Sequence, residues 1–512
     1  MNGAESLMRT ARQAGIEVCF ANPGTTEMQL VAALDSVGGM RAVLGLFEGV
    51  CTGAADGYAR MSGKPALTLL HLGPGLANGL ANLHNARRAH SAVVNLVGDH
   101  ATWHRPFDPP LAADIESLAH PVSAWVRTTR TVTELATDMA AAIEAAQRPP
   151  GQVATLIVPQ DCAWEAAGGA APPASRPQPA RVSQHAIEAA AEGLRTAGGA
   201  LFLGGTGLRA SAARAAARVA AATGCQLWQE TLAARVDEGA HLPAIARLPY
   251  FPEDAIDALK HVRTLVLAAA SEPVSFFGYP GTPSRLVPAG CTILTLARLD
   301  EDVAHALEAL VEAVGAPRTL EIAPRPAVAR PTGDLNPYTL GQALAAVQPE
   351  GAIIVDESIT ACLGYQSFAP AAPPHTVLAV TGGSIGGGLP CAVGAALGCP
   401  EQKVIALQAD GSGMYTVQAL WSMAREHLDV TTVICANRRY RILQFEFGRA
   451  GIGEPGPRAQ ALTALEPPAL DWVALAKGLG VPGTRVDTAD ALVSALERAL
   501  AEPGPSLIEA VL

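Results

Sequence analysis

Two polar residues near the carboxyl end of the chain, Asp410 and Asn437, each follow closely on an apolar run. The runs cover residues 404–407 and 430–435, and a helical pattern over 417–425 separates them. This order predicts two neighbouring parallel strands, which place both side chains at the carboxyl edge of one sheet, where α/β proteins bind ligands. Carboxylate and amide oxygens are the ligands that a hard cation such as Mg²⁺ takes, particularly one that also clamps a phosphate. The spacing therefore predicts a site for a metal and a phosphate group.

The turn that begins at Asp410 continues with Gly411 and Ser412. Aspartate and glycine dominate turns for purely local reasons, so the tripeptide alone indicates only a turn. Its place between two strands, with Asn437 after the second, favours the functional interpretation. A helix is expected to start after Gly411, and its free N–H groups and its dipole would then face the phosphate.

A second acidic residue, Glu48, ends an apolar segment and has Phe47 and Val50 as near neighbours. A buried acid without a partner is costly, so such a residue usually has a function. The alternative is a glutamate at the start of a helix, satisfied by backbone N–H groups. The sequence Ala-Asp-Gly-Tyr-Ala-Arg follows at residues 55–60.

Composition and charge argue against several classes of function. The net charge of −11 and the aromatic content of 4% argue against a nucleic-acid partner. The nine cysteines are scattered without a CxxC pair, which indicates small buried side chains of a cytoplasmic protein rather than disulfides or a zinc site. No apolar run reaches the roughly 18 residues that span a bilayer, and the first residues lack the pattern of a signal peptide. We therefore expect a cytoplasmic protein that does not bind a membrane.

Two stretches rich in alanine and proline, 166–180 and 316–337, read as linkers. They divide the chain into segments 1–165, 181–315 and 338–512, each near the usual size of a domain. In every segment short apolar runs alternate with helical patterns, which predicts three α/β domains with doubly wound parallel sheets.

The middle segment contains a glycine-rich turn at residues 204–207, directly after the apolar run 200–203. Such a turn can cradle a dinucleotide, and an NAD-dependent oxidoreductase is one function that it would allow. The full three-glycine pattern is absent and no suitably placed acid follows, so a structural strand-to-helix turn is the favoured interpretation.

The segments described above resemble those of the thiamine diphosphate (ThDP)-dependent 2-oxo acid enzymes. The family's Gly-Asp-Gly motif and its later Asn match residues 409–411 and Asn437, with Ala409 in place of the first glycine. The family's catalytic glutamate matches Glu48. Further matching segments lie at residues 20–27, 71–78, 381–386 and 437–440. The resemblance implies an N-terminal aminopyrimidine-binding domain (1–165), a central α/β domain (181–315) and a C-terminal diphosphate-binding domain (338–512).

The resemblance also implies a role for each matching residue. Glu48 is expected to contact N1′ of the aminopyrimidine, and His71 to move a proton later in the reaction. Thr25 and Asn78 are expected to meet the substrate. The expected cofactor contacts are Gly383, Ile385, Asp410, Gly411, Ser412, Asn437 and Tyr440. The expected Mg²⁺ ligands are Asp410, Asn437 and the backbone carbonyl of Arg439.

The activity that the resemblance implies is decarboxylation of a 2-oxo acid through a C2-ylide and an enamine. The product is either released, as by a lyase, or passed to a second carbonyl, as by a carboligase. His71 favours a benzoylformate decarboxylase-like enzyme, whereas residues 443–470 look closer to acetolactate synthases, transferases that condense pyruvate. A ThDP-binding subunit without catalysis is a further alternative. The presence of Glu48 and of both expected metal ligands, Asp410 and Asn437, argues against it.

Two features of quaternary structure and cofactor content follow from the same resemblance. Glu48 and the diphosphate motif lie in different domains, and in the family these domains meet between subunits. We therefore expect a homodimer or a dimer of dimers (a homotetramer) with active sites at the subunit interface. FAD is a possible cofactor, because acetolactate synthases and pyruvate oxidases carry it in the middle domain, but the short middle segment argues against it.

Overall fold

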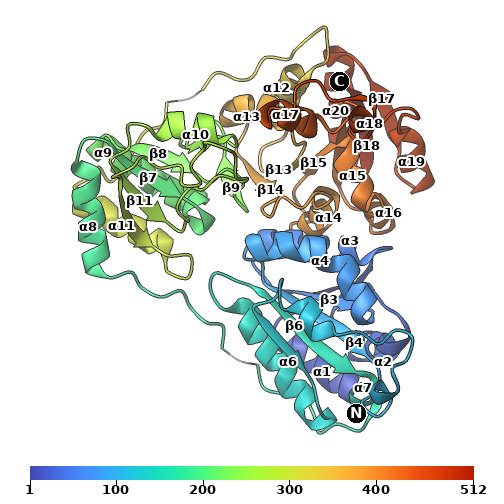
Figure 1. Ribbon diagram of the computed structural model, residues 1–512. Helices are drawn as coiled ribbons and strands as arrows, with labels where there is room; N and C mark the ends of the chain where they lie inside the picture. The colour runs from blue at the N-terminus through green and yellow to red at the C-terminus, as the bar shows by residue number, and fades with distance from the viewer. Residues whose placement is uncertain (174, 324) are drawn as a thin grey trace.

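The computed structural model describes residues 1–173, 175–323 and 325–512. They form three α/β domains, each built on a parallel sheet with helices on both faces (Figure 1). The predicted fold class is therefore confirmed, whereas the boundaries at 165, 181, 315 and 338 stay predictions.

The first domain has a six-stranded parallel sheet in the order β2-β1-β3-β4-β6-β5. Its central strands are buried along their whole length, as expected for apolar runs that are covered on both faces. The strands are β1 (Val18–Asn22), β2 (Arg41–Leu44), β3 (Ala66–Leu70), β4 (Val93–Asp99), β5 (Trp125–Thr128) and β6 (Val153–Pro159). The helices are α1 (Gly3–Gln13), α2 (Met28–Val37), α3 (Glu48–Ser62), α4 (Leu72–Arg88), α5 (Ile115–Ala119), α6 (Val132–Gln147) and α7 (Gln160–Trp164).

The central domain has a five-stranded sheet in the order β10-β8-β7-β11-β12. Its strands are β7 (Gly199–Leu203), β8 (Gln226–Gln229), β10 (Ala246–Arg247), β11 (Thr264–Ala268) and β12 (Thr292–Ala297). Its helices are α8 (Gln184–Arg195), α9 (Ala210–Thr223), α10 (Pro252–Leu259) and α11 (Val303–Val314).

The third sheet has the order β17-β18-β16-β15-β13-β14-β9. Its edge strand β9 (Val236–Glu238) comes from the middle of the chain and pairs antiparallel with β14. The other strands are β13 (Ile353–Glu357), β14 (His375–Ala379), β15 (Val404–Ala409), β16 (Val430–Ala436), β17 (Gly483–Val486) and β18 (Ser506–Val511). The helices are α12 (Pro337–Val347), α13 (Cys362–Phe368), α14 (Gly388–Gly398), α15 (Asp410–Gly413), α16 (Ala419–Arg425), α17 (Arg441–Arg449), α18 (Pro457–Ala461), α19 (Trp472–Gly478) and α20 (Ala489–Ala501).

The expected helix after Gly411 is shorter than the sequence suggests. The chain forms the single turn α15, then a 3-10 turn over Met414–Thr416, and only then α16. One helical turn adds little dipole, so the expected contribution of the dipole at this turn is small. Ala409 has a φ of −73°, an ordinary extended conformation, so alanine is accommodated there without strain.

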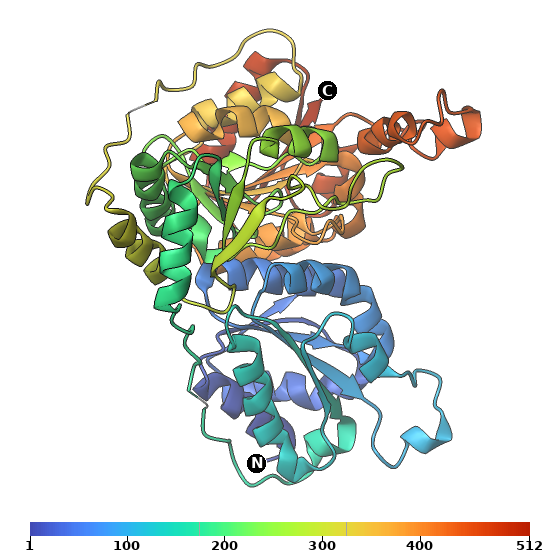
Figure 2. The same cartoon turned by 60° about the vertical axis from the view of Figure 1, so that its left-hand side comes forward.

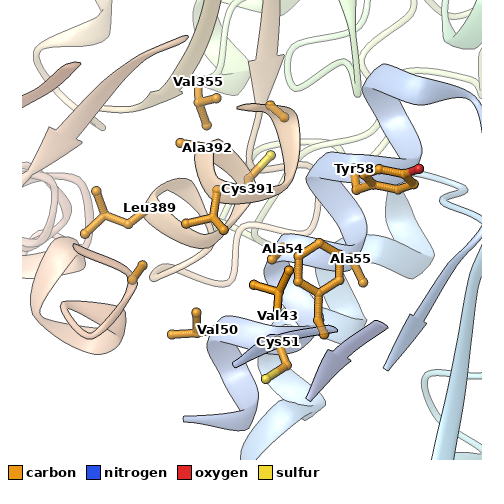
Figure 3. Close-up of a cluster of buried hydrophobic side chains, with 14 of the residues drawn as sticks. Val43, Val50, Cys51, Ala54, Ala55, Tyr58, Val355, Leu389, Cys391 and Ala392 are labelled. Carbon is orange, nitrogen blue, oxygen red and sulfur yellow. The ribbon is translucent and has the colours of Figure 1, made fainter. Parts of the chain in front are cut away.

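Helices α3 and α14 join the first and third domains in one hydrophobic core. Figure 3 shows Val50 and Tyr58 of α3 on one side of this contact and Leu389 and Ala392 of α14 on the other. The helix backbones approach closely: a Cβ added at Gly57 would lie 2.0 Å from the carbonyl oxygen of Cys391. The two domains therefore pack at a distance that only glycine permits.

Replacing Gly57 by alanine should therefore destabilise the protein. In most helices this change is stabilising by about 0.5–1 kcal/mol, because alanine restricts the unfolded chain. Here the added methyl group overlaps backbone, and we expect a net loss of about 1–3 kcal/mol. Thermal unfolding followed by circular dichroism measures the effect. Gly478→Ala is the matched control, since no atom lies within 4 Å of its added Cβ; equal midpoints for the two variants would contradict this close packing.

A buried ion pair connects the three domains. Arg60 pairs with Asp56 in α3, and both side chains are almost fully buried. The Arg60 guanidinium also donates to the carbonyl oxygen of Ala379 at 2.7 Å and to that of Ala234 at 3.5 Å. The Ala-Asp-Gly-Tyr-Ala-Arg sequence thus contributes to the packing of the domains. Within the described part of the chain, we find no helix with the length and apolar character that crossing a membrane requires.

Candidate active site

Asp410 and Asn437 lie at the ends of adjacent strands, as their spacing predicts. In the β15–β16 pair, Ala409 stands opposite Cys435. The buried carboxylate of Asp410 accepts hydrogen bonds from the backbone N–H groups of Gly411 (2.9 Å) and Arg438 (2.6 Å). The second bond holds the carboxylate against the peptide that joins Asn437 to Arg438.

The surroundings of Asp410 suit a cation and a phosphate. Burial raises the pKa of the Asp410 carboxyl group, so a nearby cation would stabilise its charged form. The Asn437 side-chain oxygen accepts a hydrogen bond from the N–H of Arg439 at 3.0 Å. The Tyr440 ring covers Gly411, and a Cβ added at Gly411 would lie 2.5 Å from the ring. Ser412 donates to the carbonyl of Ala409 at 3.2 Å.

The donors at this edge fit Mg²⁺ better than a transition metal. The described residues contain no group of three histidine, cysteine or acidic side chains that could hold a metal. A carboxylate, an amide oxygen and a backbone carbonyl would leave coordination positions for phosphate oxygens and water, in the mixed oxygen shell that Mg²⁺ prefers.

Residues 381–387, called here the cofactor loop, run from β14 to α14. Gly383 has a φ of +70° and open space around its Cβ position. Glu357, the last residue of β13, accepts from the N–H groups of Gly386 and Gly388 at 2.6 Å each. Burial raises the pKa of Glu357 to about 7. Glu357 was not predicted as a site residue, although it ends an apolar strand as Asp410 follows one.

Glu48 is the first residue of α3 and only 8% exposed. Its Oε2 accepts a hydrogen bond from the side-chain amide of Asn78, in α4, at 3.0 Å. Glu48 and His71 flank Gly75 in the first turn of α4: a Cβ added there would lie 3.0 Å from Glu48 Oε1 and 3.4 Å from His71 Cβ. The fold thus brings Glu48, Asn78 and His71 together.

His71 is the N-cap of α4 and is oriented by a fully buried glutamate. Its Nδ1 lies 2.8 Å from Oε2 of Glu27, which also accepts from the N–H of Gly24 at 2.7 Å. Thr26 donates to the other oxygen of Glu27 at 2.5 Å. Because a carboxylate accepts hydrogen bonds, this contact favours the tautomer of His71 that carries its proton on Nδ1, with Nε2 as the second ring nitrogen. A Cβ at Gly24 would lie 2.3 Å from the imidazole, so glycine is required there.

Glu27 lies in the segment 20–27 that resembled the family, but its pairing with His71 was not predicted. The two residues are far apart in the sequence and meet because β1 and β3 are neighbours in the sheet. Thr25 begins the 3-10 turn Thr25–Glu27 next to this pair, and its side chain is exposed. It is therefore placed where a ligand can reach it.

Glu27→Gln should impair catalysis without unfolding the protein. Glutamine has nearly the same volume, but its amide has only one acceptor oxygen where the carboxylate has two, and it carries no negative charge to stabilise a charged His71. We expect kcat to fall about 10- to 100-fold, as for other residues that orient a reacting side chain. Steady-state kinetics measures this, with Glu116→Gln, a glutamate that bonds only Thr128 at the surface, as the control. An unchanged kcat for Glu27→Gln would assign the pair to structure alone.

The glycine-rich turn of the central domain is partly filled by groups of the chain itself. The N–H of Gly204 donates a hydrogen bond to the carbonyl oxygen of Ala268 at 3.0 Å. The carboxyl group of Glu230 lies against the turn, 2.6 Å from the position of a Cβ at Gly204, and desolvation raises its pKa to about 7. A carboxyl group therefore lies at the strand end where a dinucleotide diphosphate would need N–H donors.

Comparisons with known proteins agree with the geometry of both halves. Two family models match, "Thiamine pyrophosphate enzyme, N-terminal TPP binding domain" over residues 1–118 and "Thiamine pyrophosphate enzyme, C-terminal TPP binding domain" over residues 360–510. A "Putative acetolactate synthase large subunit" of Mycobacterium tuberculosis is 49% identical over 100% of this chain and 99% of its own length. The benzoylformate decarboxylase of Pseudomonas aeruginosa is 30% identical over 97% of this chain and 96% of its own. The solved thiamine diphosphate-dependent 4-hydroxybenzoylformate decarboxylase of Rhodococcus jostii RHA1 superposes with a TM-score of 0.87 at 26% identity, covering 100% of this chain and 99% of that one.

Proposed function

The chain belongs to the thiamine diphosphate-dependent enzymes, and from that premise we propose that it decarboxylates a 2-oxo acid with ThDP and Mg²⁺ bound. It is an enzyme of the decarboxylase or acetolactate synthase type. The observation that carries the finer proposal is the pair of positioned groups at the start of α3 and α4: Glu48 held by Asn78, and His71 held by Glu27.

The residues of the third domain would hold the diphosphate end of the cofactor. Asp410, Asn437 and the carbonyl of Arg439 would bind Mg²⁺ on the diphosphate, with Ser412 and Tyr440 as neighbours. In the cofactor loop, the Gly383 carbonyl would accept from the aminopyrimidine and Ile385 would support the bent cofactor. When bound, ThDP supplies a carbon nucleophile that adds to the 2-oxo acid and takes up the electron pair released with CO₂.

The residues of the first domain would move protons. Glu48 would hold a proton at the ring nitrogen N1′, and its bond to Asn78 fixes the carboxylate for that contact. His71, with Nδ1 bound to Glu27, would present Nε2 to the substrate and give or take a proton there. Thr25, next to this pair, would contact the substrate carboxylate.

The substrate and the fate of the product can be determined in one assay. Purified protein with ThDP and Mg²⁺ is incubated with pyruvate, a branched-chain 2-oxo acid and an aryl 2-oxo acid, CO₂ is measured, and products are identified by mass spectrometry. We expect an aldehyde from a branched-chain or aryl acid. The absence of CO₂ from every acid, with ThDP bound, would contradict the proposal.

Acetolactate synthesis is the second candidate function, and the relative of 49% identity favours it. A synthase passes the two-carbon unit from one pyruvate to another 2-oxo acid. Acetolactate as the main product from pyruvate in the same assay would establish this alternative, whereas free acetaldehyde from pyruvate would argue for the decarboxylase.

We also propose that the active sites form between two copies of the chain, in a homodimer or a dimer of dimers. Several large apolar side chains stay exposed in the single chain: Trp103 and Phe107 are 63% and 77% exposed, and Leu443 and Phe445 of α17 are exposed as well. Two segments project from the body of the molecule in Figure 2: the segment after β4 and the segment that contains α17 and α18. Such exposed apolar groups are typical of an interface.

Mixing two inactive variants tests the shared site. In a heterodimer of Glu48→Gln and Asp410→Ala subunits, one site would carry both defects and the other none. Co-expression should therefore restore about a quarter of wild-type activity, because half of the dimers formed at random are heterodimers with one intact site. Separately purified variants that are not allowed to exchange subunits are the control. If each site lies within one chain, every site keeps a defect and activity stays absent.

A further inference from the structure

Helix α4 carries two asparagines, Asn82 and Asn85, that the proposed mechanism does not use. Both are only 2% exposed. Asparagine is rarely buried so completely unless its amide is hydrogen-bonded, since an unpaired buried amide is costly. Both side chains contact the cofactor loop of the same chain, so each helps to join the first and third domains.

Asn85 forms a two-point contact with the backbone of the cofactor loop. Its side-chain N–H donates to the carbonyl oxygen of Ser384 at 2.7 Å, and its side-chain oxygen accepts from the N–H of Ser384 at 3.2 Å. Ser384 lies between Gly383 and Ile385, the two residues assigned to the aminopyrimidine end of the cofactor. The amide therefore fixes the orientation of both peptides that flank this position.

Asn82 extends the contact to the start of α3, whose Glu48 would serve the other active site of the proposed dimer. Its side-chain N–H group donates to the carbonyl of Gly49 at 2.8 Å and to that of Gly386 at 3.3 Å. Its oxygen accepts from the side chain of Asn85 at 3.1 Å. The first turn of α3, which begins with Glu48, and the cofactor loop are thus joined through two side-chain amides.

Domain cohesion alone does not account for these amides. Helices α3 and α14 already join the domains through apolar and backbone contact, in which Gly57 meets Cys391 and Gly394 meets Ala54. Apolar side chains at 82 and 85 would add to that contact, but they would leave three carbonyl groups without these donors. A fully paired polar network instead fixes one conformation of the backbone that it binds.

We propose that Asn82 and Asn85 are positioning residues, which hold the Gly383–Ile385 backbone in the conformation that brings the two rings of bound ThDP together. This inference rests on the proposed function. Asn85 acts on the loop directly, and Asn82 fixes Asn85 and relates the loop to the start of α3. The diphosphate contacts proposed for Asp410 and Asn437 are separate from this network. Asn82 and Asn85 should therefore control the reactivity of bound ThDP more than the affinity for ThDP.

Asn85→Asp is the most conservative test. Aspartate keeps the shape and the acceptor for the Ser384 N–H, but it puts an oxygen opposite the Ser384 carbonyl and opposite the side-chain oxygen of Asn82. The readouts are ThDP affinity and the rate at which the C2 hydrogen of bound ThDP exchanges with deuterium, measured by acid quench and NMR. We expect nearly unchanged affinity and exchange slowed by about 10- to 100-fold, the effect of leaving the buried Ser384 carbonyl without its donor.

Asn95→Asp is the matched control for loss of a buried asparagine. Asn95 is fully buried in β4 and bonds only Thr68 and Thr155, so this variant should lose stability but exchange C2 at the wild-type rate. Equal exchange rates for Asn85→Asp and Asn95→Asp would overturn the inference. Should Asn85→Asp fail to fold, Asn82→Ala takes its place, and wild-type exchange in that variant would overturn the inference equally.

A double-mutant cycle with Ile385→Ala separates positioning from general destabilisation. If Asn85 acts through Ile385, the two changes should affect exchange non-additively, because either one releases the same contact with the cofactor. Additive effects would overturn the inference. If the wild-type protein and Asn85→Asp accelerate C2 exchange equally, only the role of Asn85 is refuted. If the wild-type protein binds no ThDP, the proposed function itself is refuted.

Discussion

Glu48→Gln should bind ThDP as the wild-type protein does and lose nearly all turnover. Glutamine fills the same space at the start of α3, so the packing against Gly75 and the contact with Asn78 can persist. An amide cannot share a proton with a ring nitrogen as a carboxylate does. We expect kcat to fall by about 10²–10⁴-fold, the usual contribution of a positioned acid or base. Steady-state rates and fluorescence titration with ThDP measure the two quantities.

Glu509→Gln is the control for removing a buried glutamate charge. Glu509 is 1% exposed in β18 and pairs with Arg485, so this change should lower stability while leaving kcat close to wild type. A Glu48→Gln variant with wild-type turnover would show that Glu48 does not transfer a proton, and the residue would then be a helix-start glutamate held by Asn78.

Asp410→Ala should abolish retention of ThDP. Removing one partner of a buried ionic contact typically costs about 3–5 kcal/mol, which corresponds to roughly 10²–10⁴-fold in affinity. The N–H groups of Gly411 and Arg438 would lose their acceptor as well. Cofactor that stays with the protein through gel filtration, with and without Mg²⁺, is quantified by chromatography.

Asp161→Asn is the matched control for Asp410→Ala. Asp161 is a buried aspartate of the first domain that bonds Thr102, so its replacement should leave ThDP retention intact. Wild-type protein should lose ThDP when a chelator is added. If Asp410→Ala keeps ThDP in the presence of the chelator, neither the metal nor this carboxylate holds the diphosphate.

The parts of the fold and site that follow from local sequence patterns were predictable. The strands around Asp410 and Asn437 are apolar runs with clear ends, and parallel strands deliver their next residues to one edge. Residues 404–407 and 430–435 lie within β15 and β16. Glu48 was singled out for the same reason, because it follows the run that forms β2.

The parts that depend on contacts distant in sequence were not predictable. β9 has three residues, too few for a periodic signal, and it joins the third sheet only because the central domain packs there. The pairing of His71 with Glu27 needs the adjacency of β1 and β3. Asn82 and Asn85 look like ordinary polar positions of an amphipathic helix, and only the docking of the cofactor loop reveals their partners.

The central claim is that this chain binds ThDP and activates it. Hydrogen–deuterium exchange at C2 of ThDP bound to the wild-type protein with Mg²⁺ tests that claim directly, because it needs no knowledge of the substrate. We predict exchange far faster than in free ThDP at the same pH, and a return toward the free rate in Glu48→Gln. Bound ThDP that exchanges no faster than free ThDP would contradict the account.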